Sequence, residues 1–148
     1  MPDVVIPDAS CLIVLSKTGE LELLKQLYPK IIISKEIANE FSQSIPKWIE
    51  VRELENTNFL ELLNAILDSG EASAIALAES IPNSLLILDD LKARKYAKEL
   101  KLNLTGTIGV IVKAKKSGVI RDVHPIIDKF LKTDFRISPK IINEILKH

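Results

Sequence analysis

Short apolar runs alternate with segments of helical periodicity along the whole chain. The predicted strands are residues 4–7, 31–33, 48–54, 85–88 and 102–104. Three of these runs, 4–7, 31–33 and 85–88, are continuously apolar, which is typical of strands buried on both faces of a parallel sheet. Residues 48–54 alternate between apolar and polar positions and are predicted to form a short edge strand. Strands that alternate with helices predict a doubly wound α/β fold.

Helical patterns fill most of the remaining chain. Helices are predicted at residues 10–16, 21–27, 59–67, 70–78, 92–101, 126–132 and 139–146, another runs from the turn at 105–109 to Gly118, and one more follows Ser34. Ser34 is a suitable N-cap for the helix that contains Ile37 and Phe41. The helix at 59–67 is apolar on more than one side, so we expect it to be buried or paired. Together with the apolar C-terminal helices, it predicts an oligomer.

Composition narrows the class of protein. The chain has 148 residues, of which 47% are hydrophobic, and this is enough for a single soluble domain over residues 1–148. No run approaches the roughly 18 apolar residues of a membrane span, and the first residues lack the pattern of a secretory signal. Cys11, the only cysteine, excludes internal disulfides and a thiolate metal cage and is predicted to be a small core residue. We therefore expect a cytoplasmic protein with no membrane partner.

The zero net charge hides an uneven distribution of charged residues. Residues 1–90 carry 6 Lys and Arg against 15 Asp and Glu, whereas residues 91–148 carry 14 against 5, which gives −9 and +9. Such asymmetry is consistent with an acidic metal-binding edge beside a basic face that neutralises phosphates of nucleic acid. The alternative is two solvated faces of opposite sign that serve self-association.

Four acidic residues that are far apart in the sequence are the candidate metal ligands: Asp8, Glu40, Glu71 and Asp89. Asp8 and Asp89 follow predicted strands, and the carboxyl ends of parallel strands meet at one edge, where α/β proteins bind ligands. Glu40 shares a helix face with Glu36, one turn away. Carboxylate oxygens favour Mg²⁺ or Mn²⁺. Carboxylates around one or two such ions can activate water for phosphodiester hydrolysis.

Other catalytic chemistries have little support in the sequence. His124 precedes a proline and His148 is the last residue, so both are predicted to lie on the surface, which disfavours serine–histidine catalysis. No Walker-type or Gly-x-Gly-x-x-Gly loop is present, which disfavours dinucleotide binding and ordinary nucleotide triphosphate hydrolysis.

Several polar residues near the acidic set are secondary candidates. Ser10 can contact a ligating carboxylate or a metal-bound water, or cap its own helix. Thr107, at the start of a helix, can meet a phosphate. Arg94 can fork onto phosphate or brace Asp89. Basic residues after Asp89 are candidates for a nucleic-acid path, or are ordinary exposed residues of a helix: Lys92, Arg94, Lys95 and Lys98.

The order of these motifs resembles the PIN-domain superfamily over nearly the whole chain. Residues 4–10 followed by 12–15 look like the opening of PIN-domain proteins, and 36–40, 70–78 and 88–90 with Arg94 resemble their later acidic segments. Thr107 in the segment 105–109 and the ending 135–138 are similar to a prokaryotic PIN-like subfamily predicted to bind nucleic acid. Asp90, beside Asp89, is a secondary site residue in this pattern.

The resemblance implies a three-layer α/β/α sandwich around a mainly parallel sheet and Mg²⁺- or Mn²⁺-dependent cleavage of single-stranded RNA. It also implies a homodimer, and often a toxin restrained by an antitoxin protein. Carried over by position, Asp8, Glu40, Glu71 and Asp89 are the metal-binding acids. Glu71 departs from the aspartate that usually opens the third acidic segment in toxin members, and its longer side chain puts the position of the ion in doubt.

Each acidic residue also has an ordinary structural explanation. Asp8 and Asp89 can cap the helices that follow their strands. Glu71 can interact with the dipole at the start of its helix. Glu40 can be a solvated residue, with Glu36 the contributor or neither. The complete set favours function, because independent caps need not follow the ordered motifs of one family.

Two other functions remain open from the sequence. One is a PIN-like nucleic-acid-binding module with weak or no catalysis, which the Glu71 departure favours. The other is a small-molecule phosphatase or a phosphoacceptor domain, since Asp8 and the pair Asp89–Asp90 at strand ends also suit those chemistries. Against the latter, the segment at residues 8–10 lacks the second aspartate of the common phosphatase motif.

Overall fold

The computed structural model describes residues 2–147 and contains one central sheet. Its strands in the described chain are β1 (Val4–Pro7), β2 (Ile31–Ser34), β3 (Ile49–Arg52), β4 (Ser84–Ile87) and β5 (Leu104–Thr105). They are ordered β3-β2-β1-β4-β5, and every pairing is parallel. Strand order reverses direction beside β1, so β1 and β4 flank the point where α/β proteins bind ligands.

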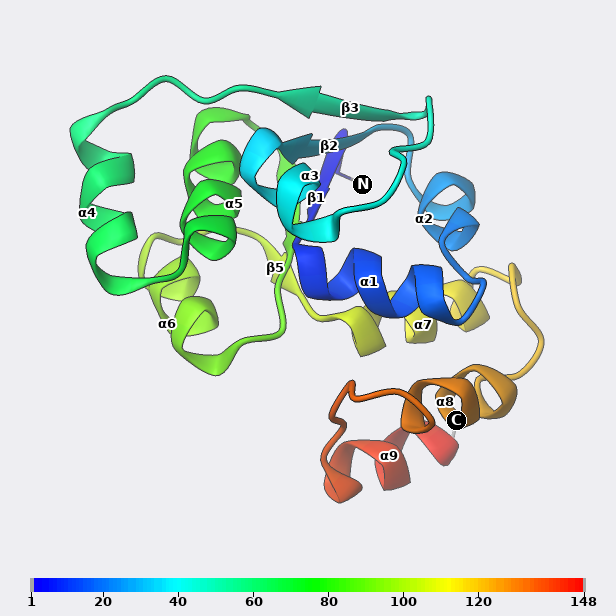
Figure 1. Cartoon of the computed structure of the whole chain (residues 1–148). Helices are drawn as coiled ribbons and strands as arrows, with labels where there is room; N and C mark the ends of the chain where they lie inside the picture. The colour runs from blue at the N-terminus through cyan, green and yellow to red at the C-terminus, as the bar shows by residue number, and fades with distance from the viewer. Residues whose placement is uncertain (1, 148) are drawn as a thin grey trace.

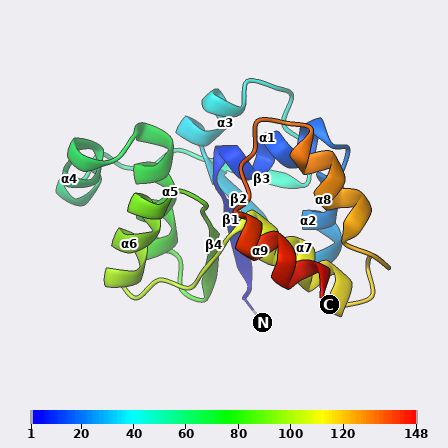
Figure 2. The same ribbon diagram turned by 90° about the horizontal axis from the view of Figure 1, so that it is seen from below.

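Helices cover both faces of this sheet, which confirms the predicted three-layer α/β/α sandwich. The helices within residues 2–147 are α1 (Ala9–Lys17), α2 (Glu22–Leu27), α3 (Lys35–Phe41), α4 (Asn58–Ile66), α5 (Ser69–Ser80), α6 (Leu91–Glu99), α7 (Thr107–Lys116), α8 (His124–Leu131) and α9 (Pro139–Leu146). Figures 1 and 2 place α4, α5 and α6 on one side and α1, α2 and α7 on the other, with α8 and α9 outside α7.

The register of the two central strands brings their carboxyl ends together. Pro7 pairs with Ile87, and the Asp8 N–H donates to the Ile87 carbonyl at 2.9 Å. The chain after β1 and the chain after β4 therefore leave the sheet side by side. Two of the predicted acidic residues, Asp8 and Asp89, lie on these two neighbouring exits.

Small residues let α5 approach the sheet closely. Alanines and serines of this helix are buried, and it contacts β1, β2 and β4. The hydroxyl groups of Ser34 and Ser73 lie 2.7 Å apart in the interior. Ser34 also caps α3, as predicted, by accepting a hydrogen bond from the Ile37 N–H at 3.0 Å. This serine pair fixes the start of α3 against α5.

Most element boundaries differ from the predictions by one or two residues, and two of these shifts have a clear local cause. The last strand lies at 104–105, after the predicted 102–104, because Lys101 adopts a positive φ of 61° and the Leu102 N–H still bonds back to the Ala97 carbonyl of α6. Helix α8 begins at His124, before the predicted 126, because Pro125 is favourable in a first helical turn. His124 is exposed, as predicted, whereas His148 lies outside the described residues.

Helix α4 is less buried than its composition predicted. It packs on α5 through Leu60 and Leu63, but Leu62 is 68% exposed and Ile66 is 39% exposed. Of the two predicted alternatives, a buried helix or a paired one, full burial within this chain is therefore wrong, and pairing stays a prediction. An apolar strip of α4 faces solvent. Cys11, in contrast, is fully buried, as predicted. No helix in residues 2–147 combines the length and the apolar character that crossing a bilayer requires.

Candidate active site

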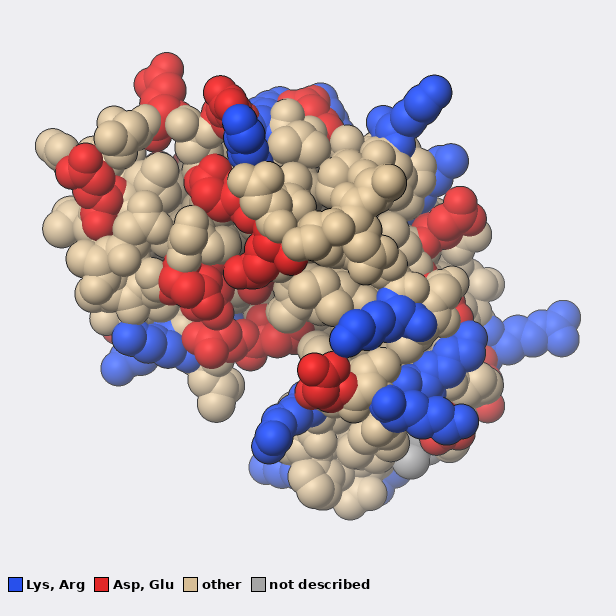
Figure 3. Space-filling model, in the orientation of Figure 1, with Lys and Arg blue, Asp and Glu red and all other residues tan. Residues whose placement is uncertain are grey.

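Acidic side chains gather in a cleft of about 590 Å³ at the carboxyl edge of the sheet. Figure 3 shows them as a band across the middle of the molecule, between α3 and α5 on one side and α8 and α9 on the other. The carboxylates that line the cleft, among the described residues, are Asp8, Glu40, Asp68, Glu71, Asp89, Asp90 and Asp134. All four predicted metal-binding acids are therefore brought to one cleft.

Asp8 lies deepest of the predicted acids, with 5% of its surface exposed. It occupies the N-cap position of α1, yet its side chain makes no cap hydrogen bond, so the capping explanation does not account for it. Its Oδ1 is buried and has no hydrogen-bond partner among the described residues. Burial raises the pKa of Asp8 to about 7, and the nearby carboxylates of Glu40, Asp68 and Asp89 add to the rise, although the Ala9 N–H partly opposes it.

Asp89 is held by the turn between β5 and α7. The Thr107 N–H donates to Oδ1 of Asp89 at 2.9 Å, and the Thr107 hydroxyl donates to Oδ2 at 2.5 Å. Asp89 does not cap α6; Asp90 does, by accepting from the Ala93 N–H at 2.9 Å. Thr107 is itself fully buried, which disagrees with the predicted direct phosphate contact and makes it a positioning residue for Asp89.

Replacing Thr107 with valine is expected to weaken the predicted metal-dependent phosphodiester hydrolysis about 10- to 100-fold. Valine has nearly the same shape but lacks the hydroxyl that binds Oδ2 of Asp89. The free energy of unfolding should fall by about 1–2 kcal/mol, since the Asp89 carboxylate loses a charge-assisted hydrogen bond. Thr107→Ser keeps the hydroxyl and should remain close to the wild type in both measurements. Equal losses in the valine and serine variants would contradict the positioning role.

Arg94 does not brace Asp89 in the predicted way. Its Nη1 donates to the Leu88 carbonyl at 2.6 Å, and this oxygen belongs to the chain between β4 and Asp89. A Cβ atom on Gly106 would lie 2.9 Å from Asp89 Oδ1 and 3.3 Å from Arg94 Nη1. Arg94 and Asp89 thus both occupy the space beside Gly106 that a side chain there would fill, and Arg94 contacts the main chain that leads to Asp89.

Glu71 stands in the first turn of α5, beside an acidic residue that the sequence pattern did not indicate. Asp68 is the N-cap of α5 and accepts from the Glu71 N–H at 3.1 Å. Burial raises the pKa of Glu71 to about 8, and the negative charges of Asp68, Asp90 and Asp8 add to this rise. The spacing of Asp68 and Glu71 is that of a capping box, which is the signal by which Asp68 could have been found.

Glu40 reaches the cleft from the last turn of α3, whereas Glu36 does not line it. Burial raises the pKa of Glu40, and Asp68 adds to the effect. The Glu40 carboxylate lies against Gly70, where an added Cβ would be 3.0 Å from Oε2 and 3.1 Å from Oε1. The buried contact between Ser34 and Ser73 sets this approach of α3 to α5.

Gly70→Ala is expected to displace the Glu40 carboxylate and weaken Mn²⁺ binding about tenfold. Its effect on stability should be neutral or favourable by up to about 1 kcal/mol, because alanine suits a helix better than glycine. Isothermal titration with Mn²⁺ measures the first effect and thermal melting the second. In a Glu40→Gln background the alanine should have little further effect on binding, and an undiminished effect there would exclude Glu40 as its cause.

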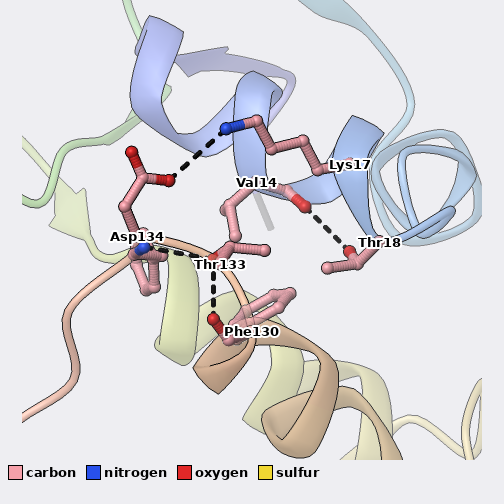
Figure 4. A network of polar contacts seen from close by, with 7 residues as sticks. Val14, Lys17, Thr18, Phe130, Thr133 and Asp134 are labelled. Atoms are coloured by element: carbon pink, nitrogen blue, oxygen red, sulfur yellow. Dashed lines mark hydrogen bonds and ion pairs between the residues drawn. The ribbon is translucent and has the colours of Figure 1, made fainter.

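The segment at residues 132–138, which joins α8 to α9 and is called the strap below, forms the outer wall of the cleft through Thr133, Asp134, Phe135 and Arg136. Figure 4 shows Lys17 of α1 reaching Asp134, and their charged atoms lie 3.4 Å apart. The Thr133 hydroxyl donates to the Phe130 carbonyl at 2.6 Å. The sequence pattern did not assign these strap residues or Lys17 to the site.

The remaining predicted residues divide between the cleft and its surroundings. Ser10 lines the cleft, and it is not the N-cap of its helix, because Asp8 holds that position. Lys92 and Lys95 are exposed and line no part of the cleft. Arg94 and Lys98 line a second groove that is continuous with it.

Comparison with known families agrees with this geometry. A family model described as a PIN domain matches residues 4–148. The chain belongs to the PIN-domain family. PIN domains are generally nucleases that bind nucleic acid and typically use divalent metal ions, so the chain is a nuclease-type protein. No curated protein matches this PIN domain closely enough to count as a relative.

The donor set of this PIN domain fits a hard divalent cation. The acidic residues of the cleft offer carboxylate oxygens, which are the ligands that such cations prefer. The buried Asp8 Oδ1 has no hydrogen-bond partner among the described residues, and a bound cation would provide one. As the side chains lie, no three Asp, Glu, His or Cys residues within 2–147 are close enough together to hold one ion. Binding therefore requires side-chain rotation, and Glu40 and Glu71, which are partly exposed, have the freedom to rotate.

Proposed function

We propose that this PIN domain is a Mg²⁺- or Mn²⁺-dependent endoribonuclease that hydrolyses phosphodiester bonds of single-stranded RNA. The observation that carries the proposal is the unpaired, buried Oδ1 of Asp8 in a cleft lined by further carboxylates. A buried polar atom without a partner costs about 1–3 kcal/mol, and a cation removes that cost. Mutually repelling carboxylates likewise gain from a shared positive charge.

Asp8, Glu40, Glu71 and Asp89 would hold the cation in this proposal. A bound Mg²⁺ or Mn²⁺ would supply an acidified water and charge neutralisation at the phosphate. The chain itself contributes position: Thr107 holds both oxygens of Asp89, and Arg94 holds the backbone that leads to it. Asp68 and Asp90 keep their carboxylates at the cleft while capping α5 and α6.

We also propose that the protein is a cytoplasmic toxin, that an antitoxin protein restrains it, and that it acts as a homodimer. The exposed apolar strip of α4, with Leu62 and Ile66, supports self-association. A short neighbouring reading frame for a DNA-binding protein would support the toxin role. Its absence would count against the toxin role and leave the nuclease proposal unchanged.

Cleavage of single-stranded RNA tests the proposal directly. The purified protein should cut a labelled single-stranded RNA in the presence of Mg²⁺ or Mn²⁺ and should stop when EDTA is added. A matched double-stranded RNA and a single-stranded DNA of the same sequence define the substrate class. Cleavage that persists in EDTA, or no cleavage with either metal, would overturn the proposal.

A second candidate function is a binding module with the PIN scaffold and weak catalysis. The observation that favours it is the lack, within residues 2–147, of three acidic side chains already gathered for one ion. Salt-sensitive RNA binding without metal-stimulated cleavage would select this function over the nuclease.

A further inference from the structure

A second groove, of about 720 Å³, runs beside the acidic cleft. Its walls are α6, the turn from β5 into α7, and the strap with the start of α9. Asp89, Phe135 and Arg136 line both the groove and the cleft, so the two form one continuous surface. An extended ligand that is bound across the cleft therefore has a path into the groove.

The electrostatic character changes along this path. Of the nine charged residues in the described chain that line the cleft, seven are acidic. The charged residues that line the groove are Arg94, Lys98 and Arg136, with Asp89 at the junction. Arg94 is engaged with the Leu88 carbonyl. The side chains of Lys98 and Arg136 are exposed and form no ion pair or side-chain hydrogen bond with the described residues. Two cations thus stand at the groove without an internal counter-charge.

Apolar side chains complete the groove. Leu91, at the start of α6, is 83% exposed, and Ile141 of α9 is 44% exposed. Both line the groove. Phe135 is anchored by an edge-to-face contact with Phe130, with ring centroids 5.5 Å apart, and this contact fixes the strap beside Arg136. Exposed apolar surface and cations in one groove suit a ligand with charged links and flat apolar faces, which is the chemistry of a single nucleic-acid strand.

We propose that this groove binds the phosphodiester backbone of the RNA segment that leads away from the acidic cleft, with Lys98 and Arg136 as the phosphate-binding residues. The inference rests on the proposed ribonuclease function and adds the path of its substrate. Lys92 and Lys95 are also on α6 but do not line the groove. The location of the cations, and not the basic character of α6 as a whole, then determines RNA affinity.

Binding measured without catalysis tests the groove. Fluorescence anisotropy with a labelled single-stranded RNA of about ten nucleotides, in EDTA, compares Lys98→Glu and Arg136→Glu with Lys95→Glu. The first two should weaken binding at least about tenfold and lower the salt dependence by about one counterion each, whereas Lys95→Glu should stay within about twofold. Lys95 is a matched control because it is exposed on the same helix and undergoes the same charge reversal.

The outcomes separate this inference from the nuclease proposal. If the wild type never cuts RNA but Lys98→Glu and Arg136→Glu still weaken binding selectively, the groove stands and the nuclease falls. If Lys95→Glu weakens binding as much as Lys98→Glu, or neither groove variant changes it, the groove is refuted even where cleavage is robust. Competition by polyglutamate as strong as that by unlabelled RNA would also refute it, in favour of an acidic protein partner.

Discussion

Asp8→Asn is expected to abolish metal-dependent RNA cleavage and, at the same time, to stabilise the metal-free protein. The loss of activity should exceed about 1,000-fold, because the deepest carboxylate of the site is removed. The gain in stability arises because burial makes the charged form of this residue costly and raises its pKa to about 7. Asparagine has nearly the same shape and carries no charge.

The stabilising effect should be large enough to measure by thermal melting near pH 8. A gain of about 2 kcal/mol corresponds to roughly 5 °C in a protein of this size. Asp134→Asn is a matched control, because Asp134 also lines the cleft but is exposed and has a lowered pKa owing to its own backbone hydrogen bond and to Lys17. This control should not raise the melting temperature.

An Asp8→Asn protein that cuts RNA as fast as the wild type would remove Asp8 from the catalytic set. A lower melting temperature near pH 8 would contradict the unfavourable burial of its charge. The two readouts are independent, so failure of one leaves the other open to test.

The metal-free protein is expected to lose stability as pH rises from about 5 to about 8. The pKa of Asp8 is 3.8 when unperturbed and about 7 in the folded protein. Between these values the folded state binds more protons than the unfolded state, so the free energy of unfolding falls with increasing pH. Glu71, with its pKa raised from 4.5 to about 8 by burial and by neighbouring carboxylates, extends the fall upward.

Denaturant unfolding at several pH values measures this fall, which should amount to about 2–3 kcal/mol after allowance for solvent screening. Mg²⁺ or Mn²⁺ should restore most of the loss near pH 8 and have little effect near pH 5, because protons and the cation compete for the same oxygens. The Asp8→Asn variant should show a shallower pH dependence. Wild-type stability that rises between these pH values would show that the carboxylates are not held under repulsion.

The local pattern of apolar and polar residues was sufficient to predict most of the fold, because the observed strands and helices follow the periodicity of that pattern. The buried strands at β1, β2 and β4 and the Ser34 cap needed only a short window of sequence. The position of β5 was misjudged because a positive φ at Lys101 depends on how α6 meets the sheet. For helix α4 the sequence predicted a buried or a paired helix, and the pattern of apolar faces alone does not determine whether their partner is in the same chain.

The residues of the site also divide into those that the sequence pattern could predict and those that it could not. Asp8 and Asp89 follow strands, and parallel topology brings them together, so their meeting was predictable. Asp68 was missed because only the packing of α5 brings this N-cap residue to the cleft. The strap was missed because Arg136 reaches the cleft only through the packing of α8 and α9. The anchoring of Asp89 by Thr107 joins residues on different elements, and periodicity cannot specify such a contact.

Anomalous diffraction from crystals grown with Mn²⁺ tests the central claim most directly. A Mn²⁺ peak should lie in the acidic cleft, within ligand distance of Asp8 and at least one of Glu40, Glu71 and Asp89, and the Asp8→Asn crystals should lack it. A peak elsewhere in wild-type crystals, or an unchanged peak in Asp8→Asn crystals, would contradict a metal site built around Asp8.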